Sequence, residues 1–138
     1  MTDILTKEER SKRMSLVRSK NTKPEIQVRK LIYGLGYRYR LHSNDLPGHP
    51  DLVFKGRRKI IFIHGCFWHR HKRCKLARLP KSKLEFWKVK LEKNHKRDVR
   101  VQKNLKEMGW KILVLWECEL QKGLDIIEKK VIAFLDKR

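Results

Sequence analysis

Apolar residues recur every three or four positions in three segments of this 138-residue chain. Such spacing places them on one face of an α-helix. We therefore predict amphipathic helices at about residues 23–35, 82–108 and 124–135. Gly36 and Gly109 follow the first two. Glycine is a typical helix stop, because it adopts the left-handed conformation that ends a helix at little cost.

Hydroxyl residues stand three positions before a glutamate at three places, which is the spacing of a capping box. The pairs are Thr6 with Glu9, Thr22 with Glu25, and Ser82 with Glu85. The second and third pairs predict where two of the amphipathic helices begin. The first pair begins a basic segment with few apolar residues. We therefore interpret residues 1–20 as a basic N-terminal arm and residues 21–138 as one domain.

Shorter apolar runs predict the strands of a single sheet. We expect strands at about residues 37–42, 51–54, 59–64 and 110–116, with a hairpin turn at 56–58. The last run is apolar throughout after Lys111, as in a strand covered on both faces. With the arm counted as a helix, the order is α, α, β, β, β, α, β, α. This order indicates an α/β fold with a central sheet flanked by helices.

Asn94 and Asp98 interrupt the apolar stripe of the helix predicted at 82–108. The other members of the stripe are Leu84, Trp87, Leu91, Val101, Leu105 and Met108. Two interpretations are open: the polar pair bonds a neighbouring loop, or the stripe passes beneath a polar site. In either case both side chains need hydrogen-bond partners.

The chain carries 36 Lys and Arg against 15 Asp and Glu, a formal net charge of +21. Self-repulsion of this size destabilises a compact fold unless a polyanion relieves it, so nucleic acid is the expected partner. A merely well-solvated basic surface is the alternative, but solubility needs a net charge of only about 2 to 8 in a small domain. No apolar run approaches the roughly 20 residues of a membrane span, and no signal-like stretch is present. We therefore expect an intracellular protein.

Three cysteines and one histidine have a spacing that suits a metal ion. They are Cys66, His71, Cys74 and Cys118. Three thiolates and an imidazole form a closed tetrahedral set of the kind that holds structural zinc. An odd number of cysteines in an intracellular protein argues against disulfides. The alternative is that Cys66 and Cys118 are small buried residues and that Cys74 lies on the surface.

Asp51, His64 and His69 remain outside this set and indicate a reaction centre. Asp51 follows Pro50 at the start of an apolar run, where a carboxylate at a sheet edge can hold a hard cation such as Mg²⁺. A neutral imidazole can take a proton from water. A cation and a base are the parts that phosphodiester cleavage needs. Taken singly, a histidine near an apolar strand is more often structural than catalytic.

Several motifs together resemble those of the very-short-patch-repair (Vsr) DNA mismatch endonucleases, over about residues 6–120. They are Arg10-Ser11-Lys12-x-Met14, Leu46-Pro47-Gly48-x-Pro50-Asp51, His64-Gly65-Cys66-Phe67-Trp68-His69, Glu85-Phe86-Trp87, Asn94-x-x-Arg97-Asp98, Gly109-Trp110 and Trp116-Glu117-Cys118. The resemblance implies a variant of the restriction-endonuclease-like PD-(D/E)XK fold, with a mixed central sheet and a structural zinc. It also implies a strand-specific nick on the 5′ side of the thymine in a T:G mismatch, the product of 5-methylcytosine deamination.

The resemblance implies a role for each candidate catalytic residue. Asp51 and the main-chain carbonyl of Ile63 would bind the catalytic Mg²⁺. His69 would be the general base, and His64 would steady the phosphate. Two further carboxylates would complete the site, Glu25 and Asp98.

An aromatic wedge that enters the DNA base stack is implied as well. Its members would be Phe67, Trp68 and Trp87, with Met14 pressing from the opposite groove. Unstacking costs least at a mismatch, where apolar side chains recover the lost stacking. The alternative for Trp87 is a place in the hydrophobic core. Further expected DNA contacts are Arg13, Lys90 and Asn94.

Two departures from the family pattern stand out. Ile63 replaces the usual Thr, and the loop between His71 and Cys74 is one residue longer. We expect a cytoplasmic, nucleoid-associated bacterial monomer that acts on double-stranded DNA, with a MutL-type mismatch-repair protein as a partner. Two other functions stay open: a related restriction or mobile-element nuclease on the same scaffold, and a non-catalytic zinc-stabilised DNA-binding protein. The latter would tolerate the loss of Asp51 and His69.

Overall fold

The structure is a computed structural model that describes residues 22–136. Its helices are α2 (Lys23–Gly34), α3 (Leu84–Glu107), α4 (Glu117–Lys122) and α5 (Leu124–Asp136). Its strands are β1 (Arg40–Leu41), β2 (Leu52–Phe54), β3 (Lys59–His64) and β4 (Lys111–Trp116). Short 3-10 helices occupy Lys55–Arg57 and Lys75–Ala77. The predicted arm, with Arg13 and Met14, lies outside the described residues.

The four strands form one mixed sheet in the order β1-β2-β3-β4. β1 and β2 are antiparallel, as are β2 and β3, whereas β3 and β4 are parallel. In the parallel pair, Ile61 lies opposite Leu113 and His64 lies opposite Trp116. Because both strands run in one direction, their carboxyl ends meet at the same edge of the sheet. The segments that follow β3 and β4 therefore start side by side.

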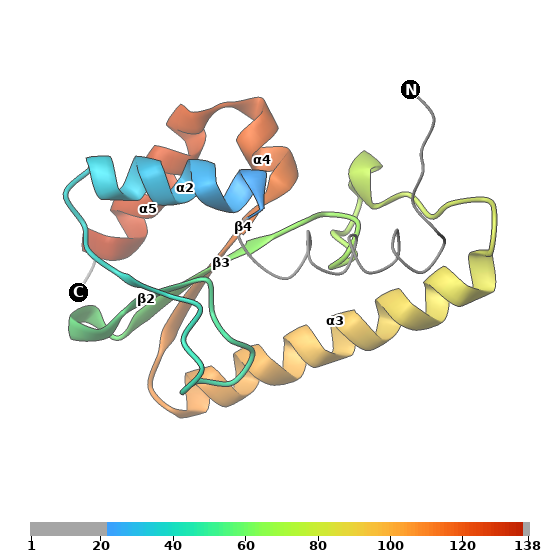
Figure 1. Cartoon of the computed structure of the whole chain (residues 1–138), viewed down its shortest axis with the longest axis horizontal. Helices are drawn as coiled ribbons and strands as arrows, with labels where there is room; N and C mark the ends of the chain where they lie inside the picture. Colours follow the sequence, from blue (N-terminus) through green and yellow to red (C-terminus); the bar gives the residue numbers. More distant parts are fainter. Residues whose placement is uncertain (1–21, 137–138) are drawn as a thin grey trace, which may run out of the picture.

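Helices cover both faces of the sheet, which confirms the predicted α/β fold class (Figure 1). α2, α4 and α5 lie on one face, and α3 runs along the other. Side chains of β3 alternate between two hydrophobic cores. Ile61 packs in a core with Ile32 of α2 and Val131 of α5, and Ile60 packs in a core with Leu105 of α3. This burial on both faces explains the unbroken apolar run of β3.

The predicted helices are confirmed to within two residues, but one of the predicted caps is wrong. Thr22 caps α2 as expected, and its hydroxyl accepts the Glu25 N–H at 3.4 Å. Ser82 does not cap α3. The residue before α3 is Lys83, which is in the left-handed conformation and makes no side-chain cap bond. A backbone bond from the Trp87 N–H to the Lys83 carbonyl, at 3.2 Å, closes the first turn instead.

Two other elements differ from the sequence prediction. α4 was not expected, and it begins directly after Trp116, whose N–H donates to the Glu119 carboxylate at 3.0 Å. The strand expected at 37–42 is reduced to Arg40–Leu41. The residues before it turn toward α2, because the Tyr39 hydroxyl donates to the Arg29 carbonyl at 2.9 Å.

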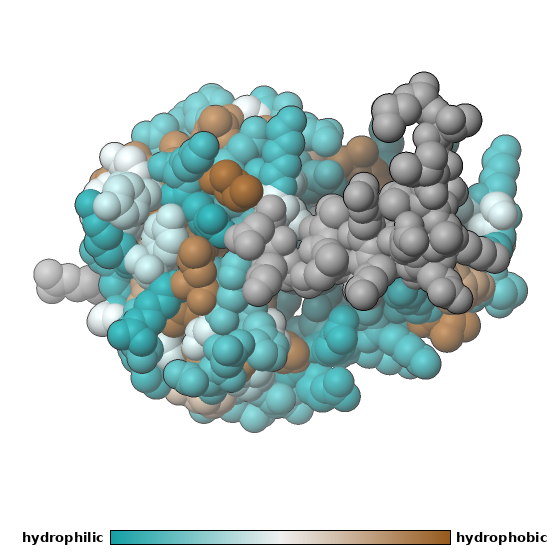
Figure 2. Space-filling view, in the orientation of Figure 1, coloured by the Kyte–Doolittle hydropathy of each residue, from teal (hydrophilic) through white to brown (hydrophobic). Residues whose placement is uncertain are grey.

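Polar residues dominate the visible surface of the molecule (Figure 2). Apolar residues appear on this face as small separate patches. The pattern agrees with the net charge of +21. Within residues 22–136, no helix is both long and apolar enough to cross a membrane.

Gly48 brings the loop before β2 against α3. Its φ is +75°, a conformation that residues with a Cβ adopt only with strain. A Cβ at this position would also overlap the Val101 side chain of α3. Asp51 follows three residues later, so this close approach helps to determine where Asp51 lies.

We expect Gly48→Ala to lower the free energy of unfolding by about 1–3 kcal/mol, because it combines backbone strain with overpacking. Gly34→Ala is the matched control, since no atom lies within 4 Å of a Cβ built there and Ala favours a helix. Urea denaturation measures both variants. Adding Val101→Ala to Gly48→Ala should recover part of the loss. Equal stability of the two glycine variants would contradict the proposed contact.

Candidate functional site

The chemically active side chains gather where β3 and β4 end. The segment after β3 folds into tight turns, in which the His69 N–H bonds the Gly65 carbonyl at 3.1 Å and the His71 N–H bonds the Cys66 carbonyl at 3.0 Å. These turns direct successive side chains to different sides of the strand end. Two polar clusters and one aromatic cluster result, and a further polar cluster forms beside Ile63 from residues of α2 and of the loop between β1 and β2.

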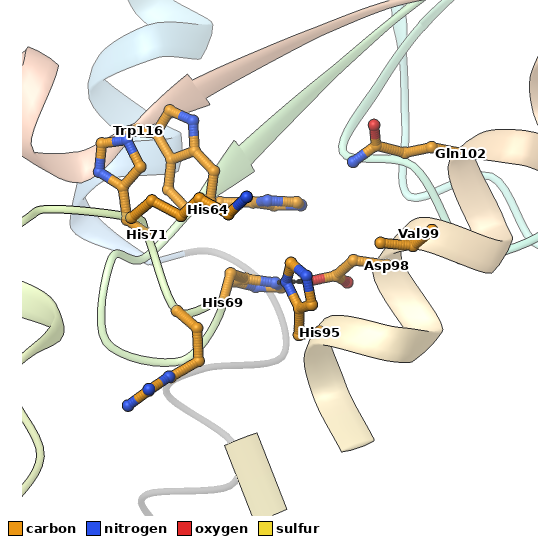
Figure 3. Close-up of a pocket in the computed structure, with 10 residues that line it drawn as sticks. His64, His69, His71, His95, Asp98, Val99, Gln102 and Trp116 are labelled. Atoms are coloured by element: carbon orange, nitrogen blue, oxygen red, sulfur yellow. Dashed lines mark hydrogen bonds and ion pairs between the residues drawn. The ribbon is translucent and has the colours of Figure 1, made fainter. Parts of the chain in front are cut away.

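The first cluster comprises His64, His69 and Asp98 (Figure 3). The two imidazole rings stack with their centroids 3.8 Å apart and their planes 5° apart. His69 Nδ1 lies 2.5 Å from Asp98 Oδ2, which comes from α3. A hydrogen on Nδ1 that is donated to Asp98 leaves a lone pair on Nε2 of His69. His69 is thereby oriented as a proton acceptor.

Burial keeps His64 neutral. Its side chain is 5% exposed, and this burial, together with the neighbouring His69, lowers the pKa of His64 to about 3. A neutral ring stacks on His69 without charge repulsion. His64 therefore fixes the position of His69, while Asp98 fixes its orientation.

The first cluster lines a cavity of about 260 Å³. Basic side chains stand around the same cavity, from Arg70, Lys72 and His95. Guanidinium and ammonium groups are the side chains that bind phosphate oxygens most strongly. The cavity thus combines a proton acceptor with charges that suit a phosphodiester.

Asn94 and Asp98 interrupt the apolar stripe of α3, and each of the two interpretations given for them holds for one residue. Asn94 bonds a neighbouring loop, since its side-chain amide donates to the Trp68 carbonyl at 3.3 Å. Asp98 instead belongs to the polar cluster with His69.

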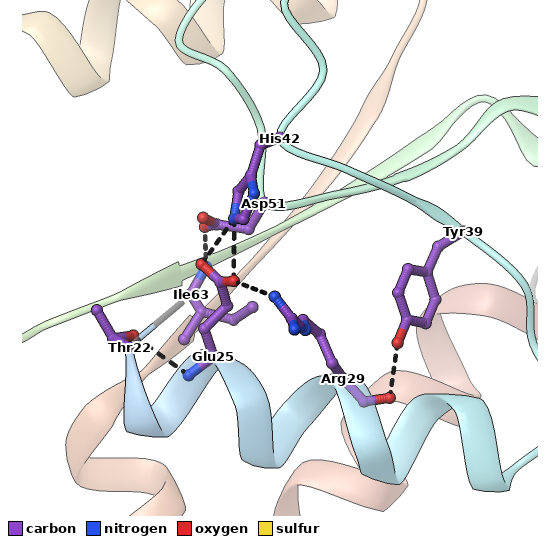
Figure 4. Close-up of polar contacts among 7 residues, drawn as sticks. All are labelled: Thr22, Glu25, Arg29, Tyr39, His42, Asp51 and Ile63. Carbon is purple, nitrogen blue, oxygen red and sulfur yellow. Dashed lines mark hydrogen bonds and ion pairs between the residues drawn. The ribbon is translucent and has the colours of Figure 1, made fainter. Parts of the chain in front are cut away.

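The second cluster comprises Glu25, His42 and Asp51 (Figure 4). Their ligand atoms all lie within 4.8 Å of one another. Glu25 stands in the first turn of α2 and is 3% exposed. His42 Nε2 lies 3.0 and 2.9 Å from the two oxygens of the Glu25 carboxylate. Arg29 donates to the same carboxylate at 2.8 Å.

Asp51 is the carboxylate in this cluster that most needs a cation. Its Oδ2 accepts the Ile63 N–H at 2.8 Å. Burial and the neighbouring Glu25 carboxylate raise the pKa of Asp51 to about 7. Two carboxylates held together away from water repel each other, and a divalent cation between them reverses that repulsion. The donor set therefore fits a hard divalent cation.

His42 is the residue of this cluster that the sequence analysis missed. Leu41 lies opposite Leu52 in the sheet, and the His42 N–H bonds the Asp51 carbonyl at 3.2 Å. A signal for this position exists in the sequence. Antiparallel pairing of the strands predicted at 37–42 and 51–54 places the end of one beside the start of the other.

The end of β3 joins the first two clusters. Ile63 contacts Asp51 through its N–H, and the next residue, His64, stacks on His69. Consecutive side chains of a strand point to opposite faces. The two clusters meet at consecutive residues, Ile63 and His64. Together with Ile63 they contain every residue that the sequence predicts for the reaction centre: Glu25, Asp51, Ile63, His64, His69 and Asp98.

The third cluster brings together the predicted zinc ligands, Cys66, His71, Cys74 and Cys118, with ligand atoms within 4.8 Å of one another. His71 Nδ1 lies 3.6 Å from Cys66 Sγ and 3.4 Å from Cys118 Sγ. Sulfur and nitrogen ligands of one tetrahedral zinc are about 3.6 Å apart at ordinary bond lengths. The spacing fits zinc, and the longer loop does not remove His71 from the set.

The electrostatics of the third cluster also favour a cation. All three cysteines are free. Burial raises the pKa of Cys66 to about 12 and also raises that of Cys118. Such thiols lose their protons when a cation lies beside them. Burial lowers the pKa of His71, which keeps the imidazole in the neutral form that a metal ligand requires.

Phe67, Trp68 and Trp87 form an aromatic cluster, with ring centroids 5.0 to 5.7 Å apart in edge-to-face arrangements. None of the three is buried, and neither hydrophobic core contains them. Trp87 is therefore not the core residue considered as an alternative. Phe86, which is 55% exposed, packs against Trp87 at 5.2 Å. Lys90 places its ammonium group over the Phe86 ring.

Residues 2–76 match the family model described as DNA mismatch endonuclease Vsr. The type II nicking enzyme V.XorIIP of Xanthomonas oryzae pv. oryzae is 49% identical over 136 residues, which cover 99% of this chain and 98% of the relative. The DNA mismatch endonuclease Vsr of Escherichia coli strain K12 is 41% identical over 121 residues, which cover 88% of this chain and 77% of the relative. This chain therefore belongs to the Vsr family of DNA mismatch endonucleases.

Proposed function

We propose that this endonuclease nicks one strand of double-stranded DNA on the 5′ side of the thymine in a T:G mismatch. The observation that carries the proposal is the stacked His64 and His69 pair, with His69 held by Asp98, directly after the peptide that binds Asp51. The cluster with the base and the cluster with the cation ligand thus meet at consecutive residues of β3. The names of the relatives support both parts, since one is a mismatch endonuclease and another a nicking enzyme.

Asp51 and Glu25 would hold the catalytic Mg²⁺, with the main-chain carbonyl of Ile63 beside them. The N–H and the carbonyl of one residue in an extended strand point to the same side. The Ile63 carbonyl therefore shares the side on which its N–H meets Asp51. A bound Mg²⁺ neutralises charge on the scissile phosphate and acidifies a water molecule. Ile63 in place of Thr leaves this role intact, because only main-chain atoms take part.

His69 would take the proton of the attacking water on Nε2. Asp98 holds Nδ1 and stabilises the imidazolium that forms, as the carboxylate does in other His–Asp pairs. When the water oxygen bonds to phosphorus, the bond from phosphorus to the leaving sugar oxygen breaks, and that oxygen takes up a proton. Arg70 and Lys72 of the cavity lining supply positive charge near the phosphate.

A structural zinc on the third cluster completes the proposal. Four protein ligands leave no position for a water molecule, so the ion would not take part in the reaction. It would tie the loop after β3 to the start of α4, where Cys118 lies. We place the zinc-stabilised domain of residues 21–138 among the PD-(D/E)XK variants, with residues 1–20 as a separate DNA-contacting arm.

The aromatic cluster would select the mismatch. Phe67, Trp68 and Trp87 stack on one another outside the cores. Such partly exposed rings can replace base stacking where the duplex opens most easily. Lys90 and Asn94 border this cluster. Arg13 of the arm would contact the DNA as well, and Met14 would press from the opposite groove.

A related restriction-associated nuclease is the second candidate, because several relatives are named type II nicking enzymes. The two candidates differ in substrate and share the site. In either case we expect a monomer acting on the bacterial nucleoid in the cytoplasm. A MutL-type repair partner belongs to the first candidate alone.

Duplexes containing T:G, T:A or an unrelated sequence, with each strand labelled separately, test the proposal. We expect a Mg²⁺-dependent nick in the thymine strand of the T:G duplex. His69→Ala should lower its rate by about 10²–10⁴, the usual effect of losing a general base. Asp51→Ala should abolish the nick, because it removes a ligand of the cation. DNA binding should change only a few-fold. His49→Ala changes a residue in an exposed loop and is the control, so it should cut at the wild-type rate. If Asp51→Ala or His69→Ala also cuts at the wild-type rate, the role assigned to that residue is wrong.

We expect one zinc ion per chain by elemental analysis. Cys118→Ser should lose it and become several kcal/mol less stable, because zinc binding at such sites is folding free energy. His95→Ala lies outside the ligand set and should keep the ion. A metal-free protein that melts at the wild-type temperature would contradict the structural role. Zinc retained by His71→Ala would move the fourth ligand elsewhere.

Trp68→Ala should lower affinity for the T:G duplex more than for the T:A duplex, by roughly 1–3 kcal/mol, since stacking is gained only where the bases open. Arg13→Ala should weaken binding to both duplexes alike, as a phosphate contact does. Fluorescence anisotropy at one salt concentration measures all four affinities. If Trp68→Ala lowers both affinities equally, the aromatic cluster does not select the mismatch. A restriction-associated nuclease then becomes the better-supported function.

A further inference from the structure

We propose that His42 is a direct ligand of the divalent cation, so that the site contains a nitrogen donor and favours Mn²⁺ over Mg²⁺ more than an all-oxygen site does. The inference rests on the proposed function, because it concerns the same cation. Three segments supply the donors: Glu25 from α2, His42 directly after β1, and Asp51 directly before β2. Figure 4 shows the three side chains converging.

The spacing of the donors suits one ion. His42 Nε2 lies 3.0 and 2.9 Å from the Glu25 oxygens. Neighbouring ligand atoms of an octahedral ion with bonds near 2.1 Å are also about 3.0 Å apart. A cation between His42 and Glu25 would therefore require little movement of either side chain. The His42 side chain is 20% exposed, so water molecules can fill further coordination positions.

A purely supporting role for His42 would duplicate contacts that Glu25 already has. Arg29 donates to the Glu25 carboxylate at 2.8 Å. The Glu25 main chain is fixed in the first turn of α2, where its N–H donates to Thr22. Glu25 is thus held in place from its own helix, and the imidazole nitrogen adds a donor that the cation can use.

The backbone of His42 is held beside Asp51. Its φ is 46°, which is uncommon for a residue with a side chain, although histidine tolerates it better than most. Its N–H bonds the Asp51 carbonyl at 3.2 Å. The turn after β1 therefore fixes the imidazole beside both carboxylates.

The identity of the donor atom determines which metal ion binds more tightly. Carboxylates and carbonyls suit Mg²⁺ and Mn²⁺ alike, whereas imidazole suits transition metals. An imidazole nitrogen next to Glu25 and Asp51 therefore raises the affinity for Mn²⁺ and leaves that for Mg²⁺ nearly unchanged.

Pulsed EPR of the full-length, zinc-loaded protein with less than one equivalent of Mn²⁺ tests the ligand directly, without any activity measurement. We expect ¹⁴N modulation from a bound imidazole in the wild type and its loss in His42→Gln. Glutamine keeps a hydrogen-bond donor for Glu25 but removes the nitrogen ligand. Calorimetry should show about a 10-fold loss of Mn²⁺ affinity in His42→Gln, against a change of less than about 3-fold for Mg²⁺.

His49→Gln is the matched control, because His49 lies in the same loop and bonds Asn44 instead. It should keep both the ¹⁴N modulation and the Mn²⁺ affinity. Mn²⁺ bound without ¹⁴N modulation in the wild type would overturn the role of His42 and leave the proposed endonuclease site intact. Modulation that persists in His42→Gln would overturn it as well. No Mn²⁺ binding at all, or binding unaffected by Asp51→Ala, would contradict the cation site on which both proposals depend.

Discussion

The parallel pairing of β3 with β4 is the constraint on which the rest of the structure depends. It places His64 opposite Trp116, so the two segments that leave the sheet start as neighbours. The Cys118 N–H then reaches Cys66 Sγ at 3.4 Å. Parallel strands also require a long crossover connection, which here contains α3 and brings Asp98 to His69. One strand pairing thus assembles both the predicted zinc ligands and the predicted base.

Polar groups are buried at the same strand end, Glu25 and His64 among them. From Ile60 to Ile63, β3 carries apolar side chains on both faces, and the polar clusters begin where its hydrophobic cover ends. The clusters respond to burial differently: burial lowers the pKa of His64 and keeps it neutral, whereas burial beside Glu25 raises the pKa of Asp51. A ligand that binds only the folded chain stabilises it. A cation at Glu25 and Asp51 would therefore offset the repulsion between the two carboxylates and stabilise the folded chain.

How far the sequence predicts the structure depends on whether the signal is local. The positions of α2, α3 and α5 follow from helical periodicity, and β3 follows from its apolar run. The α4 helix has no such signal, since Glu119 caps it through the backbone of an aromatic residue, Trp116. The start of α3 was misplaced because a left-handed Lys83 determines it, and no side-chain pattern reports that conformation.

The candidate site shows the same division between local and long-range information. The composition of the run from His64 to His69 marks it as a candidate site, and the number and spacing of the cysteines indicate a metal site. The partnership of His42 with Glu25 depends on the turn after β1 and on strand register. Both are tertiary features, so a reading of individual motifs could not weigh them.

Trp116 shows why the stability of this fold and the geometry of its site are not separable. Its ring stacks on His71 at 4.0 Å, with the planes 9° apart, and meets the His64 ring at 5.2 Å edge to face. His64 in turn stacks on His69. A continuous row of rings therefore connects a predicted zinc ligand to the predicted base. Packed rings transmit displacement because the interior leaves them little free volume, so an ion that performs no chemistry would still determine where the base stands.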